Sequence, residues 1–250
     1  MYERNHLCHS LARFAKLTPD AVFLTHWQTG RVVRYREFFD NAERMAAALQ
    51  RAGVAPGDRV AVQAPKTVAM LELYVATVLA GAVFLPLNTS YQAAEVAYFL
   101  GDATPALLVC EPKKHRALLP VARACGVGTI WTLAADESGS LTDHRDAENA
   151  AFEVVERSDS DLAAILYTSG TTGRSKGAML SHGALRSNSE TLRDCWRFTS
   201  HDVLVHALPI YHTHGLFVAT NVTMMAGGSL RFMPAFDAEQ VCSAMRGASV

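Results

Sequence analysis

The chain has 250 residues, of which 50% are apolar, and its formal net charge at pH 7 is −1. This composition is typical of a soluble globular protein and excludes a disordered or fibrous one, and the near-neutral charge gives no reason to expect nucleic acid or an anionic membrane as a partner. The five cysteines are scattered and form no C-x-x-C pair that would indicate zinc or redox chemistry. The first residues lack the continuous apolar run of a secretory signal, so we expect a cytoplasmic protein whose thiols are buried and reduced.

Helical patterns alternate with short apolar runs through the first half of the chain. The first helix is predicted over 35–53, where Gly53 is a suitable C-terminal cap. The next predicted elements are a strand over 58–64, a helix over 66–81, a strand over 82–88, a helix over 92–103 and a strand over 106–110. This alternation predicts an α/β fold of layered βα units with mostly parallel sheets.

The uncharged stretch over 73–87 is the one segment that raises the question of a membrane. It is too short to span a bilayer comfortably, and it contains Gly81 and Pro86. We therefore expect a buried helix that runs into a buried strand, with no membrane insertion.

Residues 137–161 lose apolar periodicity and are rich in Ser, Asp and Glu, which is typical of a surface connection or a subdomain boundary. A strand is predicted over 161–169, and a second strand over 178–182 follows a loop rich in glycine. A helix over 182–198 has Ser181 as its expected N-cap. The glycine-rich loop is thus predicted to join two strands.

The last part of the chain again alternates, with predicted strands over 202–209 and 229–234 and predicted helices over 215–228 and 237–248. Its large apolar residues are expected to belong more often to the core than to a ligand pocket; they are Leu216, Phe217, Met224 and Met225. The chain ends where another strand would begin, so we expect it to be part of a longer domain.

The segment YTSGTTGRSKGAMLSH, residues 167–182, is a candidate phosphate-binding loop. Glycines allow the backbone amides to approach an anion closely, hydroxyl groups add hydrogen-bond donors, and Lys176 adds a positive charge. An ordinary surface hairpin is the alternative reading. The Walker A pattern does not fit, because two residues separate Gly173 from Lys176 and Gly177 stands where that loop needs Ser or Thr.

A second motif, LPIYHTHGL over 208–216, follows at a familiar separation. Together the two motifs resemble those of the acyl-adenylate-forming superfamily, which includes acyl-CoA synthetases, adenylation domains of peptide synthetases, and luciferases. The resemblance begins near Ser10 and covers nearly the whole chain, but only the first half of a usual member. Ser175 stands where most members have proline, which predicts a looser loop that still binds, because proline contributes no donor.

The resemblance implies an enzyme in which a carboxylate attacks the α-phosphate of ATP, releasing pyrophosphate, and the resulting acyl-adenylate is transferred to a thiol such as CoA. ATP, Mg²⁺ and CoA are therefore the expected cofactor and co-substrates. The implied phosphate-binding residues are Thr168, Ser169, Gly170, Thr171, Thr172, Gly173 and Lys176. His212 is expected to lie beside the acyl carboxylate as the catalytic residue.

Three further histidines need a role. His206 is predicted to be a hydrogen-bonded strand residue, His182 to be structural, and His214 to lie either in the pocket or in packing. No acidic residue or cysteine accompanies His206, His212 and His214 in their segment, so we expect no metal site there.

The longer segment LPIYHTHGLFVATNVTMMAGGSL, residues 208–230, most resembles malonyl-CoA synthetases, and this resemblance implies malonate or methylmalonate as the acid. A dicarboxylate needs a cation for its distal carboxylate, and Arg231 is available without a reason to prefer it. The sequence leaves two alternatives, an adenylation domain that loads a carrier protein and a non-catalytic nucleotide-binding protein. It leaves the oligomeric state open.

Family members carry adenine- and ribose-binding segments and a mobile C-terminal lid domain with a catalytic lysine further along the chain. None of these follows His212 here, so residues 1–250 are expected to be the N-terminal portion of an AMP-binding domain. We expect these residues alone not to complete adenylation.

Overall fold

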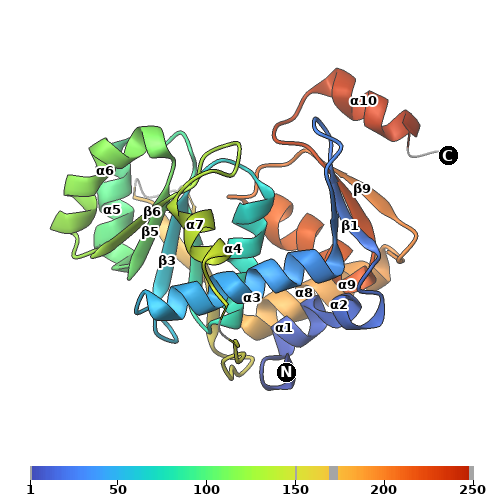
Figure 1. Cartoon of the computed structure of the whole chain (residues 1–250), viewed down its shortest axis with the longest axis horizontal. Helices are drawn as coiled ribbons and strands as arrows, with labels where there is room; N and C mark the ends of the chain where they lie inside the picture. Colours follow the sequence, from blue (N-terminus) through green and yellow to red (C-terminus); the bar gives the residue numbers. More distant parts are fainter. Residues whose placement is uncertain (1, 150, 169–173, 248–250) are drawn as a thin grey trace.

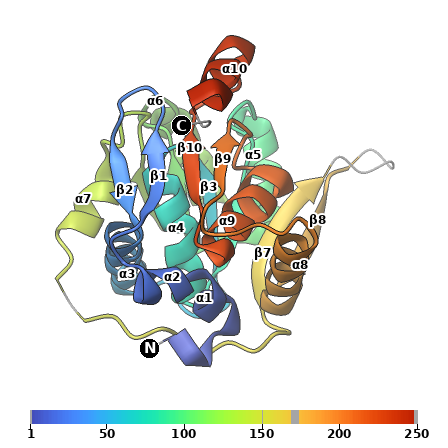
Figure 2. The same ribbon diagram turned by 90° about the vertical axis from the view of Figure 1, so that its right-hand side faces the viewer.

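The computed structural model describes residues 2–149, 151–168 and 174–247. These residues form two β-sheets with helices packed between them. Helices α5 (Ala93–Ala103) and α6 (Pro112–Ala124) cover the outer face of the larger sheet, and α10 (Ala238–Gly247) lies near one end of the smaller sheet (Figure 1 and Figure 2). This arrangement is the layered α/β fold that the sequence predicts.

The larger sheet has the strand order β6-β5-β3-β4-β7-β8. Its strands are β3 (Arg59–Gln63), β4 (Val83–Pro86), β5 (Leu107–Cys110), β6 (Thr129–Thr132), β7 (Leu162–Thr168) and β8 (Lys176–Ser181). Strands β6 to β7 in this order pair in parallel, whereas β7 and β8 are antiparallel. The glycine-rich segment therefore joins two strands, as predicted.

The smaller sheet has the strand order β2-β1-β10-β9. Its strands are β1 (Val22–His26), β2 (Val32–Arg34), β9 (Val203–His206) and β10 (Ser229–Phe232). The β1–β2 hairpin is antiparallel, and β1, β10 and β9 are parallel. The sequence analysis did not predict β1 and β2, because the hairpin is short and β2 has only three residues. It also extended β9 beyond His206, where the strand ends.

The helices lie between the two sheets, on the outer face of the larger sheet, or near one end of the smaller sheet. They are η1 (Tyr2–Arg4), α1 (His6–Leu11), α2 (Arg13–Leu17), α3 (Tyr35–Arg51), α4 (Val68–Leu79), α5 (Ala93–Ala103), α6 (Pro112–Ala124), α7 (Ser140–Asp146), α8 (His182–Cys195), η2 (His214–Thr220), α9 (Asn221–Ala226) and α10 (Ala238–Gly247). The largest buried cluster lies between the sheets around α3 and α4, a second lies under α5 and α6, and a small third lies under α10. Alternation along β3 explains the division, because Val60 and Val62 join the first cluster whereas Ala61 joins the second.

Helix ends follow the predicted capping residues. Helix α3 ends before Gly53, which has a φ of +89°, and the Val54 amide donates to the Leu49 carbonyl at 3.0 Å. The Ser181 hydroxyl accepts from the Ala184 amide at the start of α8, at 3.1 Å. Both predicted caps are thus confirmed.

Residues 215–228 form two helices instead of the single one predicted. The first, η2, is a π-helix, and α9 continues from it. The Thr220 hydroxyl donates to the Gly215 carbonyl at 2.9 Å, and the His206 ring also contacts this carbonyl. Because side chains occupy the carbonyl, the local backbone does not follow the regular α-helical pattern.

The apolar segment tested for a membrane span is buried inside the protein. Every residue of α4 is buried, and β4, which follows it, is a central strand. Among the described residues, no helix has both the length and the apolar character needed to cross a membrane.

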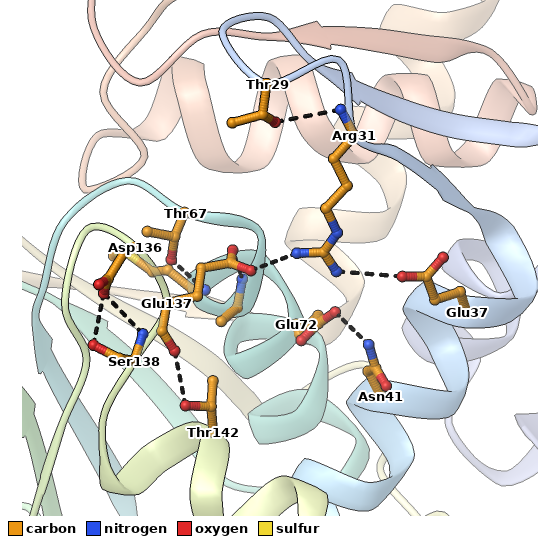
Figure 3. A network of polar contacts seen from close by, with 12 residues as sticks. Thr29, Arg31, Glu37, Asn41, Thr67, Glu72, Asp136, Glu137, Ser138 and Thr142 are labelled. Carbon is orange, nitrogen blue, oxygen red and sulfur yellow. Dashed lines mark hydrogen bonds and ion pairs between the residues drawn. The ribbon is translucent and has the colours of Figure 1, made fainter.

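An ion-pair network joins the two sheets on one side of the molecule (Figure 3). Arg31, in the β1–β2 hairpin, pairs with Glu137 at 2.7 Å and with Glu37 of α3 at 3.3 Å. Glu137 also accepts from the Ala69 amide in the first turn of α4, at 3.0 Å. The network therefore helps to set how the smaller sheet sits against the larger one.

The segment 137–161 contains α7 and then connects edge strand β6 to β7, passing close to the N-terminal residues (Figure 2). The Arg157 amide donates to the Arg4 carbonyl at 2.9 Å, and the Arg157 guanidinium donates to the Gly81 carbonyl at 2.7 Å. Its assignment as a subdomain boundary stays a prediction.

Candidate active site

The last residue pair of the β7–β8 ladder bounds the glycine-rich loop. Thr168 ends β7, Lys176 begins β8, and the two lie opposite each other in the register. Both are exposed, and within the described residues neither side chain has a hydrogen-bond or ion-pair partner. An exposed hydroxyl and an exposed ammonium group thus stand at the two ends of the loop. The other predicted phosphate-binding residues lie outside the described residues; they are Ser169, Gly170, Thr171, Thr172 and Gly173.

The second motif forms a closed loop between β9 and η2. The Nε2 atom of His206 lies 2.8 Å from the Gly215 carbonyl oxygen, so the side chain at the start of the loop bonds to the backbone at its end. The chain turns so tightly here that a Cβ atom on Gly215 would lie 2.1 Å from the Pro209 carbonyl oxygen. Glycine is therefore required at 215 by close approach of the backbone.

His212 lies in this loop with its side chain exposed. The His212 ring centroid is 4.6 Å from that of Tyr211, and its carbonyl accepts from the Leu216 amide at 3.0 Å. The backbone of His212 is thus fixed to η2 while its imidazole faces solvent. Such a side chain can donate a hydrogen bond to a bound carboxylate.

Lys66, which the sequence analysis did not single out, contacts His206 shortly before the second motif. It follows β3, and its Nζ atom donates to the His206 carbonyl at 2.8 Å and lies 3.0 Å from His206 Nδ1. The ammonium also lies 4.7 Å from the centroid of the Phe232 ring. Its position directly after a buried strand was the available signal, because the carboxyl ends of parallel strands often carry functional groups.

The contacts of His206 also fix its tautomer. A carbonyl only accepts, so Nε2 carries the proton and donates to Gly215, and Nδ1 accepts from Lys66. Burial, reinforced by the nearby Lys66, lowers the pKa of His206 to about 3. Burial also lowers the pKa of Lys66 to about 7. His206 is therefore a hydrogen-bonded strand residue, as predicted, and it is neutral. Its bond to Gly215 also closes the loop that contains His212.

The two motifs follow the carboxyl ends of strands in different sheets, and contacts between the sheets bring their surroundings together. Lys66, after β3, contacts His206 at the end of β9. Within the described residues, no hydrogen bond or ion pair joins His212 to Thr168 or Lys176. A ligand that used both motifs would have to bridge them.

The other two histidines considered in the sequence analysis, His182 and His214, differ in burial. His182 is buried, its Nδ1 atom lies 3.2 Å from Asn5 Oδ1, and burial lowers its pKa to about 4. His214 is exposed at the start of η2. In the described part of the chain, no group of three His, Cys, Asp or Glu side chains is arranged to hold a metal ion.

The prediction that the cysteines are buried is only partly correct. Cys8 and Cys110 are buried, whereas Cys195 and Cys242 are exposed, because they lie on the solvent-facing sides of the amphipathic helices α8 and α10.

An apolar groove of about 530 Å³ lies between α8 and η2. It is lined by residues that include Leu185, Leu192, Trp196, His214 and Phe217. The four apolar residues assigned to the core, which are Leu216, Phe217, Met224 and Met225, are all buried, as predicted. Phe217 is part of the core and also lines the groove.

The sequence analysis considered Arg231 as a partner for the distal carboxylate of a dicarboxylate substrate. Its guanidinium donates to the carbonyls of Ala244 at 3.0 Å and Gly247 at 2.6 Å, which lie at the end of α10. These bonds satisfy the last carbonyls of the helix. Arg231 is therefore explained by the attachment of α10 to the smaller sheet.

We expect the free energy of unfolding to fall when the pH is lowered from 7 to 5. The folded-state pKa values of His182 and His206 lie below their ordinary value of 6.5, so the unfolded chain binds more protons in this range. Each histidine should cost about 2 kcal/mol of stability at pH 5. Urea denaturation at the two pH values measures the loss. In a His182→Gln variant the loss should be about half as large, and equal stability of the parent at both pH values would contradict the prediction.

The chain matches known proteins over the part that contains both motifs. The family model described as "AMP-binding enzyme" matches residues 11–248. The chain is 32% identical over 233 residues to a feruloyl-CoA synthase of an Amycolatopsis species, a match that covers 93% of this chain and 45% of that protein. It is 30% identical over 213 residues to a mitochondrial malonate–CoA ligase of Homo sapiens, a match that covers 83% of this chain and 36% of that protein.

The fold is similar to that of a solved structure of ATP-bound MatB from Rhodopseudomonas palustris. The TM-score is 0.91 at 49% sequence identity, over 96% of this chain and 48% of the other. The chain thus spans less than half the length of these proteins. Its two motifs and both of its sheets lie within the matched part.

Proposed function

Because the chain belongs to the AMP-binding enzyme family, we propose that it forms the ATP-binding portion of an AMP-forming acid–thiol ligase. The observation that supports this most directly is the pair Thr168 and Lys176, which places an exposed hydroxyl and an exposed ammonium, without partners among the described residues, at the two ends of the glycine-rich loop. A polyphosphate needs such convergent donors. An ordinary hairpin has no need of them.

The proposed reaction has two steps. The substrate carboxylate attacks the α-phosphate of ATP, the bond to the β-phosphate breaks, and pyrophosphate leaves with the electron pair. A thiol then attacks the acyl carbon and AMP leaves, which gives the thioester. Direct attack of a thiol on a carboxylate would have to expel an oxide, so the first step supplies the leaving group.

We assign the residues of this chain to binding and orientation. Lys176 and Thr168, with the loop between them, would hold the β- and γ-phosphates. His212 would donate a hydrogen bond to the carboxylate and keep the attacking oxygen in line. Mg²⁺, carried by the ATP phosphates, would supply positive charge to the leaving pyrophosphate.

Malonate or methylmalonate is the proposed acid, and CoA the proposed thiol. Residues 208–230 resemble malonyl-CoA synthetases, and proteins similar to this chain include a malonate–CoA ligase and MatB. Because Arg231 is bonded to α10, we do not assign it to the distal carboxylate. The cytoplasmic location expected from the sequence stays a prediction.

We expect pyrophosphate release to depend on malonate or methylmalonate when the protein is expressed from its complete coding sequence. The assay compares these two acids with acetate and a medium-chain fatty acid at saturating MgATP. Release with the fatty acid but not with malonate would contradict the dicarboxylate proposal. Formation of the thioester from free CoA, with no need for a carrier protein, would separate a ligase from a carrier-loading domain.

A further inference from the structure

The ends of the phosphate loop have little support from the sheet itself. Strand β8 is an edge strand that pairs only with β7 in the described sheet, and the ladder ends at Thr168 and Lys176. The two strands extend from the body of the molecule toward the loop (Figure 2). Exposed ladder ends fray easily, so a loop carried on them needs another point of attachment.

Helix α5 supplies two such attachments, one for each strand. The Tyr98 hydroxyl donates to the Ser175 carbonyl at 2.8 Å, and the Tyr167 hydroxyl donates to Asp102 Oδ2 at 2.5 Å. Tyr167 immediately precedes Thr168, and Ser175 immediately precedes Lys176. Both bonds therefore act one residue away from a proposed phosphate ligand.

The spacing on α5 explains why one helix can reach both strands. Tyr98 and Asp102 are four residues apart, which places them on the same face of the helix. Between them Phe99 is buried, with its ring centroid 4.5 Å from that of Tyr167. The helix face thus packs against the base of the hairpin and presents a polar group on either side.

Helix α5 is itself firmly positioned. The side-chain Nε2 of Gln63, at the end of β3, donates to the carbonyls of Asn88 and Tyr91 at 2.9 Å each. These residues lie in the turn that leads into α5, where Lys114 also donates to the Tyr91 carbonyl at 3.3 Å. The attachments on Tyr98 and Asp102 therefore connect the hairpin to a rigid part of the larger sheet.

We propose that Tyr98 and Asp102 are positioning residues for ATP, which hold both ends of the phosphate loop in place before the nucleotide binds. The proposal rests on the proposed function, since it takes the loop to hold phosphates. Without the two hydroxyl bonds, Thr168 and Lys176 would be held less firmly before ATP binds. Ordering them on binding would then cost more free energy, and the affinity for ATP would fall. Ser175 makes this support more important, because serine does not restrict the backbone as proline would.

The test measures binding of MgATP by isothermal titration calorimetry to the protein expressed from its complete coding sequence. Tyr98→Phe and Asp102→Ala should each weaken binding about three- to tenfold, which corresponds to the loss of one hydrogen bond. Asp102→Asn keeps an acceptor for Tyr167 and should restore most of the affinity. Tyr167→Phe should match Asp102→Ala, and combining these two should add little, because both remove the same bond.

The matched control is Tyr2→Phe, which removes a hydroxyl bonded to Glu43, far from the loop in the sequence. It should leave the affinity for ATP unchanged. If the parent binds MgATP and Tyr98→Phe and Asp102→Ala bind it equally well, the positioning role is wrong. A parent that binds no MgATP would overturn the phosphate-binding role of the loop and, with it, this proposal.

Discussion

Replacing His212 with alanine should slow acid-dependent pyrophosphate release about a hundredfold, which is the usual cost of removing one positioned donor from the reacting group. The affinity for ATP should change little, because His212 is assigned to the carboxylate and the phosphate loop lies on the other sheet. The measurement is steady-state pyrophosphate release at saturating MgATP and acid, together with calorimetric binding of MgATP. The protein is expressed from its complete coding sequence.

The control for this prediction is His201→Ala, another exposed histidine, which lies just before β9. It should leave the rate unchanged. Since the His212 side chain is exposed, its removal should also leave the free energy of unfolding within about 0.5 kcal/mol of the parent. An unchanged rate in His212→Ala would show that the imidazole has no part in the reaction.

The candidate site could be predicted from the sequence where its residues act through local patterns. The loop between Thr168 and Lys176 has a composition that few other structures need, and the flanking apolar runs indicate strands. His212 was found because a second short motif follows at the expected distance. The Ser181 cap was equally local, since a cap depends on residues within one turn of the helix.

The residues that support the site could not be found in this way. Lys66 and His206 are 140 residues apart, and Tyr98 and Ser175 are 77 residues apart. The first pair meets because the two sheets pack against each other, and the second because α5 packs against the β7–β8 hairpin. Periodicity does not encode either arrangement. The irregular start of η2 was missed for a similar reason, because it depends on His206 and Thr220 side chains that occupy the Gly215 carbonyl.

Replacing Gly215 with alanine should lower the free energy of unfolding by about 1–3 kcal/mol, the usual cost of forcing extra atoms into a packed site. The new Cβ atom would lie 2.1 Å from the Pro209 carbonyl oxygen, so part of the backbone would have to move. Movement is restricted on both sides, since the Gly215 carbonyl is held by His206 and Thr220. Because His212 lies inside this loop, pyrophosphate release should fall as well.

Gly101→Ala separates this effect from a general response to the loss of glycine. Gly101 lies in α5, and a Cβ atom there would meet nothing within 4 Å. Alanine should therefore stabilise the helix by about 0.5–1 kcal/mol, the opposite sign from Gly215→Ala. Urea denaturation of the two variants and the parent measures both changes. If Gly215→Ala were as stable as the parent, the loop would be able to relax, and the close approach of Gly215 to Pro209 would not be what holds His212 in place.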